Sequence, residues 1–365
     1  MDSKTIKKIA VLTGGGDCPG LNSAIRAVVQ TAIVEYGIQV VGVPDGFKGL
    51  LENKFVPLDL NNTTGIFSKG GTVLGSSNVD TPFRVPVVKD GKKIYEDRSD
   101  EVVQHLKQER IDALIVIGGD GTQSIAHGMS QKGIKVVGIP KTIDNDLNGT
   151  EFTIGFFTAV ATAVDALDKL HTTAESHHRI MVVEVMGRNA GWIALFSGLG
   201  GDADAILIPE IPFEYQKIAD FLTDLHHKSK RYSIIVVAEG AKPKGGDVVI
   251  SKIIEDSPEQ IRLGGIGNQV ASQLEKLTGR ECRAMNLGHL LRGGSPEGFD
   301  RILASRFGAV AVKAVMDGNF DSMVAYKNDN VELVPLETGA GKNRFIIPDS
   351  PFLQAARHRG INFGD

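Results

Sequence analysis

The sequence predicts an α/β protein built from mainly parallel sheets. Short runs of β-branched residues alternate with helical patterns along most of the chain, and this order is typical of βαβ units. The chain has 365 residues, of which 42% are apolar, so it exceeds the length at which a single hydrophobic core usually divides. We therefore expect two domains, each with its own sheet.

The first half of the chain shows this alternation most clearly. We predict strands at 9–13, 38–43, 113–117 and 135–140, and helices at 21–36 and 122–131. The second half repeats the pattern, with strands at 179–185, 205–209 and 232–239 and a helix near 214–229. Two polar stretches, 80–100 and 240–252, are predicted as surface loops, the first with room for a small hairpin. Asp300 is the predicted N-cap of a long late helix.

Composition excludes several classes of function. Lys and Arg total 40 against 44 Asp and Glu, and the net charge of −4 gives no general attraction to nucleic acid or anionic membranes. Cys18 and Cys282 show no disulfide or metal spacing, which favours a reducing cytoplasm. The first residues lack a signal-peptide pattern, and no run of 18 apolar residues suggests a membrane span. We expect a cytoplasmic protein that binds neither nucleic acid nor membrane.

Three loop segments each follow a predicted strand, and the first two are rich in glycine. They are TGGGDCPG (13–20), GGDGT (118–122) and IPKTIDND (139–146). The carboxyl ends of parallel strands share one sheet edge, where open α/β sheets bind ligands, and glycine lets backbone N–H groups approach phosphate oxygens. The GxxxxGK[ST] motif is absent, and Pro19 interrupts a GxGxxG pattern. One such turn is typical of a simple tight turn, but three on one edge favour a phosphate site.

Asp120 and the pair Asp144 and Asp146 are carboxylates inside these segments. Asp120 would repel a phosphate unless a cation lay between them, so it indicates Mg²⁺, with a turn or N-cap aspartate as the alternative. Alternation along an extended segment would place Asp144 and Asp146 on the same side. That arrangement suits one metal-associated and one proton-accepting carboxylate, whereas the alternative is an Asx-type turn with solvated side chains.

Basic residues flank predicted strand ends in the second half of the chain. They are Arg179, Arg188, Arg283, His289 and Arg292. The planar fork of arginine grips phosphate oxygens in a bidentate manner. Any one of these arginines is typical of a surface ion pair, but four beside small-residue loops in a net acidic chain indicate a phosphorylated substrate.

Five motifs in order resemble 6-phosphofructokinase. They are GGGDCPGLN, GGDGT, PKTIDND, VEVMGR and LGHLLRGGSP, and they span roughly residues 9 to 306. The resemblance implies two Rossmann-like three-layer α/β/α domains with the active site in the cleft between them. It assigns 1–155 plus about 291–335 to the nucleotide or phosphoryl donor and 156–290 plus about 336–365 to fructose 6-phosphate. The implied reaction is phosphorylation of the sugar 1-hydroxyl by ATP and Mg²⁺ in glycolysis.

The resemblance also implies a role for each matching residue. Asp144 would be the general base, supported by Asp146, while Arg188 and Lys141 would neutralise the transferring phosphoryl group. The sugar phosphate would contact Thr142, Ile143, Asp144, Arg179, Met186, Gly187, Arg188, Glu239, Arg283, His289, Leu290, Leu291 and Arg292. Among these, Arg179, Arg283, His289 and Arg292 would clamp the 6-phosphate, and Glu239 would accept from sugar hydroxyls. The donor would contact Gly16, Asn78, Val79, Gly119, Asp120, Gly121 and Thr122, with Asp120 as the metal ligand.

Assembly and regulation are implied in the same way. Arg179 and Arg283 reach into a neighbouring subunit's site in the family, which implies a homotetramer, or a homodimer, with shared active sites. Short bacterial enzymes bind effectors at arginines whose places are taken here by Gln30, Leu60 and His171. We therefore expect an altered effector response.

Residues near the donor point to two different donors. Pyrophosphate enzymes of the family carry Asp at the place of Gly121, where it would exclude the α-phosphate of ATP, whereas Lys141 is the residue found in pyrophosphate enzymes. Asn78 and Pro44 replace an arginine and an aromatic residue of the short ATP enzymes. Because steric and charge exclusion is harder to evade than an added cation, we favour ATP and keep a pyrophosphate-dependent enzyme as the alternative.

More distant alternatives lack features that this chain has. NAD and lipid kinases share GGDGT but are not expected to carry TIDND, MGR and HLLRGG. A non-catalytic regulatory subunit would be expected to lose Asp144 or Asp120, and both are present.

Overall fold

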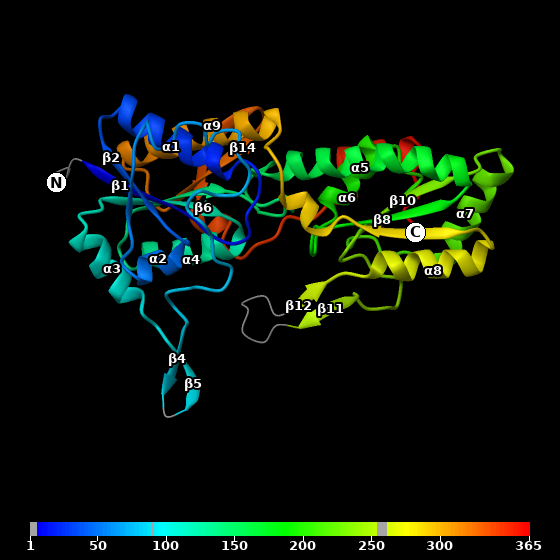
Figure 1. Cartoon of the computed structure of the whole chain (residues 1–365), viewed down its shortest axis with the longest axis horizontal. Coiled ribbons are helices and arrows are strands. Elements are labelled where there is room, and N and C mark those ends of the chain that lie inside the picture. Colours follow the sequence, from blue (N-terminus) through cyan, green and yellow to red (C-terminus); the bar gives the residue numbers. More distant parts are fainter. Residues whose placement is uncertain (1–5, 90, 254–260) are drawn as a thin grey trace. The chain divides into compact units, whose positions relative to one another are not determined.

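The computed structural model describes residues 6–89, 91–253 and 261–365. The chain forms two compact units. Unit 1 comprises Met1–Thr142, Leu147–Gly155 and Arg292–Asn343, and unit 2 comprises Ile143–Asp146, Phe156–Leu291 and Arg344–Asp365. Each unit is a mainly parallel sheet with helices on both faces (Figure 1), so the predicted α/β class is confirmed.

Unit 1 contains a seven-stranded sheet in the order β15-β14-β7-β6-β1-β2-β3. Its inner strands are parallel to one another, namely β14 (Ser322–Lys327), β7 (Val136–Pro140), β6 (Ala113–Gly118), β1 (Lys8–Thr13) and β2 (Gln39–Val43). The edge strands β15 (Asn330–Pro335) and β3 (Val56–Leu58) pair antiparallel. Every residue of β6 and β7 is buried, which is why these strands read as continuous apolar runs.

Helices cover both faces of this sheet. One face carries α1 (Leu21–Val34) and α9 (Gly298–Met316), and the other carries α2 (Phe47–Leu51), α3 (Ser99–Gln108) and α4 (Asp120–Gln131) (Figure 1). The 3₁₀ turn η2 (Leu336–Thr338) follows β15. Gly308 lets α9 approach α1 closely, because a Cβ there would lie 2.6 Å from the Cβ of Ala27.

The predicted N-cap of α9 is wrong. The helix begins at Gly298, and the side chain of Glu297 accepts the Gly298 N–H. Asp300 lies inside the first turn, is fully buried, and accepts the backbone N–H of Gly155 at 3.1 Å. A carboxylate three residues earlier therefore takes the capping position, and Asp300 instead ties α9 to the backbone of Gly155, much earlier in the chain.

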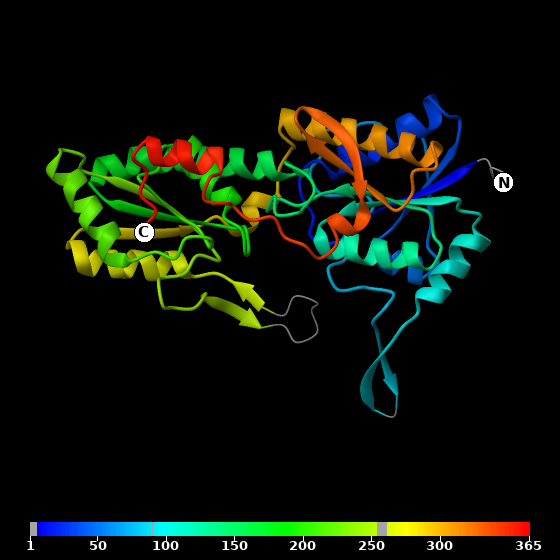
Figure 2. The ribbon, with the colours of Figure 1, turned by 180° about the vertical axis from the view of Figure 1, so that it is seen from behind.

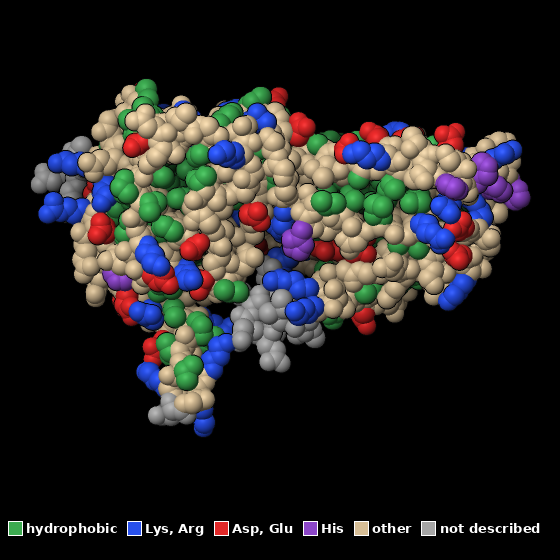
Figure 3. Space-filling model, in the orientation of Figure 1, with side chains coloured by type: hydrophobic (Ala, Val, Ile, Leu, Met, Phe, Trp, Pro, Cys, Tyr) green, Lys and Arg blue, Asp and Glu red, His purple; other side chains and the backbone are tan. Residues whose placement is uncertain are grey.

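The two polar stretches differ from one another. Residues 80–100 contain an antiparallel hairpin of β4 (Val85–Lys89) and β5 (Lys92–Glu96), which projects from the rest of unit 1 (Figure 1). The stretch 240–252 is a loop only in its first part, because β11 (Ile250–Ile253) pairs with β12 (Ile261–Leu263). On the face shown in Figure 3, acidic and basic side chains are interspersed rather than gathered by sign.

Unit 2 contains a four-stranded parallel sheet in the order β13-β8-β10-β9. The strands are β13 (Cys282–Asn286), β8 (Ile180–Val185), β10 (Ser233–Ala238) and β9 (Ala205–Leu207). One face carries α5 (Phe156–His177), α6 (Trp192–Gly200) and α10 (Pro351–His358), and the other carries α7 (Tyr215–His227) and α8 (Ile266–Thr278) (Figures 1 and 2). β13 is an edge strand of this sheet, and the 3₁₀ turn η1 (Gly288–Arg292) follows it in the chain.

Candidate functional site

Loops of unit 1 meet at the carboxyl ends of β1, β6 and β7. The N–H of Gly14 donates to the carbonyl of Ile117 at 2.9 Å, and the N–H of Lys141 donates to the carbonyl of Gly118 at 3.0 Å. The parallel register of the three strands brings their ends together. The glycine-rich segments 13–20 and 118–122 and the start of 139–146 therefore lie at one sheet edge, as the sequence predicted.

Two glycines in these loops are required by the approach of Thr122. A Cβ at Gly14 would lie 2.7 Å from Cγ2 of Thr122, and a Cβ at Gly118 would lie 2.3 Å from the same atom. Asp120 and Gly121 begin α4, with Gly119 at its N-cap. The first turn of this helix therefore presents backbone N–H groups and partial positive charge beside the loops, which suits a phosphate.

Lys141 lies under the first glycine-rich loop. Its side chain is buried, and its Nζ donates to the carbonyl of Gly14 at 3.0 Å and to the carbonyl of Gly16. A buried ammonium is stable only when it is hydrogen-bonded, and here backbone oxygens supply the bonds. The loop therefore has a fixed positive charge beneath it.

A cavity of about 470 Å³ opens beside the same loop. It is lined by Gly15, Gly16, Asp17, Gly70, Gly71, Thr72, Gly75, Ser76 and Asn78. Gly16 and Asn78 were predicted donor contacts, but Val79 is exposed and does not line the cavity. The segment 70–76 was not predicted from the sequence, although its paired glycines and the hydroxyl-bearing Thr72 and Ser76 resemble the other loops. Its signal was weak because no predicted strand precedes it.

Gly121 faces open space. A Cβ at this position would have no heavy atom within 4 Å. The structure thus leaves room for a larger ligand, or for a larger side chain, next to the first turn of α4.

Arg292 lies against the glycine-rich loop 13–20 of unit 1. Its Nη1 donates to the carbonyl of Asp17 at 3.1 Å, and a Cβ at Gly16 would lie 2.5 Å from the same nitrogen. The other basic residues predicted to hold the sugar phosphate, Arg179, Arg283 and His289, belong to unit 2. The role of Arg292 toward the 6-phosphate therefore stays a prediction, and its position suits a phosphate in the donor loop equally well.

The segment Ile143–Asp146 belongs to unit 2 and is not extended. Residues 143 and 144 form a turn, and Asn145 has left-handed backbone with φ of 51°. The alternation argument for Asp144 and Asp146 is therefore wrong, because a left-handed residue between them breaks the pleat. Both carboxylates are nevertheless buried, with 4% and 5% of their surface exposed. Ile143 is fully buried, and Thr142 precedes the turn as the last residue of its stretch of unit 1.

The predicted VEVMGR motif forms the end of β8 and a tight turn. Gly187 has φ of 142°, and a Cβ there would lie 2.6 Å from the carbonyl oxygen of Ala190. Arg188 has left-handed backbone and donates its N–H to Oε1 of Glu239 at 3.0 Å. A Cβ at Gly240 would lie 1.9 Å from the carbonyl oxygen of Arg188. Met186, Gly187 and Arg188 are thus placed by glycines in the two adjoining turns.

The carboxyl group of Glu239 has a strongly raised pKa. Burial, and after it the negative charge of Asp144, raise its pKa to about 7, against the backbone hydrogen bonds from Arg188 and Gly187. The carboxyl therefore changes its charge near neutral pH. Unit 2 thus carries two interacting carboxyl groups, those of Glu239 and Asp144, and Glu239 accepts a hydrogen bond from Arg188. Groups with shifted pKa values of this kind cluster at functional sites.

Arg179 and Arg283, two of the residues predicted to clamp the 6-phosphate, lie close together at one edge of the sheet of unit 2. Arg179 precedes β8, and Arg283 is on β13 opposite Met181. Nε of Arg179 donates to Oε2 of Glu281 at 2.8 Å, and Arg283 pairs with the same carboxylate. The hydrogen bond from Arg179 lowers the pKa of Glu281. His289 and Leu290 are exposed on η1, whereas Leu291 is buried.

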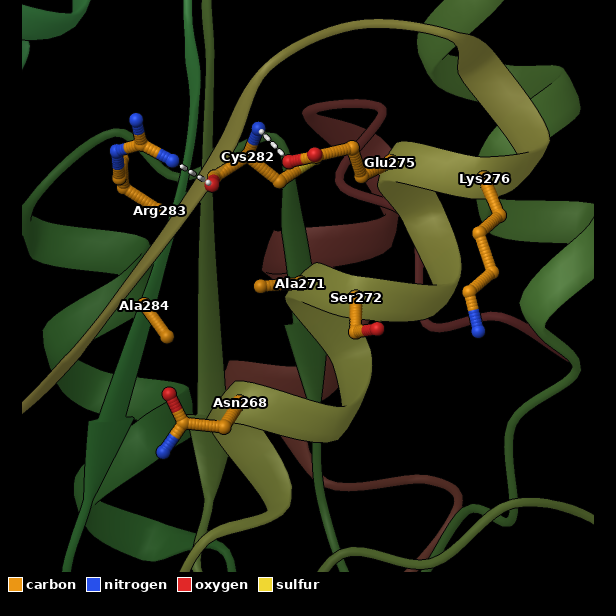
Figure 4. A pocket seen from close by; sticks show the side chains of 8 residues that line it. All are labelled: Asn268, Ala271, Ser272, Glu275, Lys276, Cys282, Arg283 and Ala284. Atoms are coloured by element: carbon orange, nitrogen blue, oxygen red, sulfur yellow. Dashed lines mark hydrogen bonds between the residues drawn. The ribbon is translucent and has the colours of Figure 1, made fainter.

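A second cavity, of about 450 Å³, lies between α8 and the edge strand β13. Figure 4 labels the residues that line it: Asn268, Ala271, Ser272, Glu275, Lys276, Cys282, Arg283 and Ala284. Glu275 accepts the N–H of Cys282 at 2.9 Å, and Arg283 donates to the carbonyl of Cys282 at 3.3 Å. Arg283 is the one predicted site residue among them, so this cavity does not gather the predicted sugar-phosphate contacts.

A metal ion would have to rely on the ligand for most of its coordination. Within 6–89, 91–253 and 261–365, no group of three or more His, Cys, Asp and Glu side chains is placed to hold a metal. Asp120 is a single half-buried carboxylate at the start of α4. Mg²⁺ is commonly bound by one or two carboxylates plus substrate phosphates, so Asp120 fits it.

None of the helices that the structure describes has the length and apolar character of a membrane span.

Comparisons with known proteins agree with the motif order. The sequence profile of a family described as Phosphofructokinase matches residues 8–315. The chain belongs to the phosphofructokinase family. An ATP-dependent 6-phosphofructokinase 2 of Clostridium perfringens is 52% identical over 362 residues, covering 99% of each chain. A pyrophosphate–fructose 6-phosphate 1-phosphotransferase of Streptomyces coelicolor is 47% identical, covering 93% of this chain and 96% of that protein.

Solved structures agree with the family at the level of the fold. The phosphofructokinase of Pichia pastoris in its T-state has a TM-score of 0.78 and 30% identity. The match covers 93% of this chain but 36% of the yeast chain, so this chain spans about a third of that protein. The resemblance first noted in the five motifs is thus confirmed by sequence and by structure.

Proposed function

We propose that this protein transfers a phosphoryl group from ATP to the 1-hydroxyl of D-fructose 6-phosphate, giving fructose 1,6-bisphosphate and ADP in glycolysis. Family membership supports the reaction, and so do relatives named ATP-dependent 6-phosphofructokinase at 52% and 47% identity over nearly the whole chain. The observation that carries the choice of donor is the open space at Gly121. A nucleotide needs room for its α-phosphate and nucleoside, which pyrophosphate lacks.

In this proposal unit 1 binds the donor. Backbone N–H groups of the loops around Gly16 and Gly119, together with the first turn of α4, hold phosphate oxygens. Lys141 supplies positive charge from below, and Asp120 is the carboxylate that holds Mg²⁺. When bound, Mg²⁺ neutralises phosphate oxygens and orients them. Because phosphoryl transfer needs little covalent chemistry from the protein, positioning and charge neutralisation account for most of the rate.

Unit 2 binds and activates the sugar phosphate. Asp144 accepts the proton of the 1-hydroxyl, and general-base help of this kind contributes about 10²- to 10⁴-fold. Asp146 supports it, and Arg188 neutralises charge on the transferring group. Glu239 accepts from sugar hydroxyls when ionised.

The 6-phosphate is held by arginines of a neighbouring subunit in this proposal. Arg179, directly before β8, and Arg283, on the neighbouring strand β13, both pair with Glu281, and a phosphate dianion can replace that carboxylate as their partner. Their exposure, 28% and 55% of each side chain, leaves them accessible to a second chain. The proposal therefore includes a homotetramer, or a homodimer, with shared sites. The free thiols of Cys18 and Cys282 support a cytoplasmic location.

Pyrophosphate is the second candidate donor for two reasons. The buried ammonium of Lys141 would favour a compact, highly charged donor, and a relative named for pyrophosphate is 47% identical. Coupled assays of the purified protein with fructose 6-phosphate, Mg²⁺ and either donor decide between them. We expect turnover with ATP, and turnover with pyrophosphate alone would reverse the choice. Absence of turnover with both donors would reject the proposed function.

A further inference from the structure

The start of the C-terminal stretch of unit 2 packs against the turn that carries the two aspartates. The backbone N–H of Arg344 donates to the carbonyl of Asp146 at 2.6 Å. The side chain of the same residue reaches one position further back, where Nη2 donates to the carbonyl of Asn145 at 3.1 Å. One residue, nearly 200 positions later in the sequence, therefore binds two consecutive carbonyl groups of the turn.

The side chain of Arg344 is itself held by Trp192. Its Cζ lies 4.2 Å from the centroid of the indole ring, a distance typical of a cation–π contact. The indole Nε1–H donates to the carbonyl of Arg344 at 3.0 Å. The indole thus fixes both the guanidinium and the backbone of the same arginine.

A partly buried carboxylate, that of Glu210, holds both Trp192 and Arg344 in place through neighbouring backbone groups. Glu210 accepts the N–H of Gly191, directly before Trp192, at 3.1 Å with each oxygen, and it accepts the N–H of Ile346 at 3.0 Å. Burial raises the pKa of this carboxyl, which is the expected cost of keeping it away from water. Its three backbone hydrogen bonds join the start of α6 to the segment that follows Arg344.

The turn needs such support because its backbone is unfavourable. Asn145 has φ of 51°, in the left-handed region, which asparagine tolerates better than most residues with a Cβ but which is still less favourable than the right-handed region. Such a conformation persists only where the surrounding structure over-determines it. The two carbonyl groups that Arg344 binds are those of Asn145 and of the next residue, so its contacts lie where the backbone reverses.

We propose that Arg344 is a positioning residue for the proposed reaction. By binding the carbonyl groups of Asn145 and Asp146, and by resting on Trp192, it keeps the carboxylates of Asp144 and Asp146 in the geometry that proton acceptance requires. The inference rests on the proposed function for its kinetic consequence. Its structural part, that Arg344 holds the turn in its left-handed form, stands apart from that function.

The kinetic test compares Arg344→Ala and Arg344→Lys with a matched control, Arg359→Ala. Arg359 also belongs to the C-terminal stretch of unit 2, donates to a backbone carbonyl, that of Leu199, at 2.8 Å, and pairs with Asp202, but it does not contact the turn. For R344A we expect kcat to fall about 10- to 100-fold while both KM values change less than about threefold, because a displaced general base costs rate more than binding. R344K recovers part of kcat, because lysine keeps the charge and one donor but lacks the planar fork.

Equal kinetics for R344A and R359A would overturn the proposal. A parallel loss in kcat and in both affinities, without recovery in R344K, would also overturn it, because it would indicate general unfolding of unit 2. Should R344A fail to fold, the kcat of R344K is compared with that of R359A. We then expect an intermediate loss of kcat in R344K, and an unchanged kcat would contradict the proposal.

A second readout does not depend on activity. We expect amide hydrogen exchange in 143–148 to become about tenfold faster in R344A and to stay unchanged in R359A. The chain has a single tryptophan, Trp192, so loss of the guanidinium from its ring should also change the intrinsic fluorescence of R344A alone. If the wild-type protein proved inactive, the proposed function would fail while this readout still decided the role of Arg344. Unchanged exchange and fluorescence would overturn that role.

Discussion

The two units prepare for phosphate in different ways. In unit 1 the candidate donor site is made of backbone, with glycines that let Thr122 and Arg292 approach and a buried ammonium, Lys141, bonded to loop carbonyls. In unit 2 the candidate acceptor site is made of carboxyl groups, and burial together with Asp144 raises the pKa of Glu239 to about 7. A site made of backbone is sensitive to added atoms, whereas a site made of carboxyl groups is sensitive to added or lost protons. The following changes separate these two sensitivities.

The largest effect is expected at the acceptor site. Asp144→Ser removes the proposed general base, and we expect kcat to fall about 10²- to 10⁴-fold. Binding of fructose 6-phosphate, measured by calorimetry, should remain detectable because the hydroxyl of serine still occupies the turn. Asp220→Ser, which removes an exposed carboxylate from α7, serves as the control. A nearly normal rate in D144S would remove the base assignment.

The next effect is expected at the donor site. Gly121→Asp puts a carboxylate into open space, so the fold should tolerate it, yet the charge would repel the α-phosphate of ATP. We expect kcat/KM for ATP to fall about 100-fold, as a repulsion of about 3 kcal/mol implies, with a smaller change for pyrophosphate. Gly121→Ala is the matched control, because it adds the Cβ without the charge. Equal losses in both variants would show that space, not charge, sets the donor preference.

Most strands of unit 1 and the loops at their carboxyl ends were predictable, because short sequence patterns determine them. Apolar β-branched runs at 113–117 and 135–140 are strands because they are buried on both faces. The α/β class and the sheet edge that gathers three loops followed from these runs. The segment 70–76 could not be predicted, because no strand introduces it and it reaches the cavity through tertiary contacts alone.

The acceptor site was less predictable for a physical reason. The left-handed backbone of Asn145 depends on Arg344, far away in the sequence, and no local pattern reports such a contact. Asp300 failed as an N-cap because Glu297 competes for the same position. The role of Gly187 was recoverable from VEVMGR, but the raised pKa of Glu239 comes from burial, which sequence alone does not measure.

A moderate, pH-dependent effect is expected for Glu239→Gln. The folded pKa of Glu239 is raised from 4.5 to about 7, so its contribution to stability is fully present below about pH 4.5 and is lost as pH rises through about 7. The loss amounts to about 3 kcal/mol. Denaturant unfolding of the wild-type protein should therefore show a fall in stability between about pH 5 and about pH 8 that is smaller in E239Q. Equal pH dependence in both proteins would contradict the raised pKa.

The smallest effect is expected for Glu281→Gln. The ion pairs of this carboxylate with Arg179 and Arg283 are exposed, and such pairs contribute little to stability. Removal of its charge leaves both arginines more available to a phosphate, so we expect the KM for fructose 6-phosphate to fall about two- to threefold. Steady-state kinetics measures this change, and an increase in that KM would show that Glu281 orients the arginines rather than competing with the substrate.

The central claim is that Asp144 lies where the phosphoryl group is transferred from donor to sugar. A crystal structure of the protein with fructose 6-phosphate, Mg²⁺ and a non-hydrolysable ATP analogue tests this claim most directly. We predict the Asp144 carboxylate at about 3 Å from the 1-hydroxyl oxygen, with the terminal phosphoryl group of the analogue on the other side of that oxygen. A 1-hydroxyl more than about 5 Å from Asp144, or a nucleotide bound away from Gly16 and Gly121, would contradict the claim.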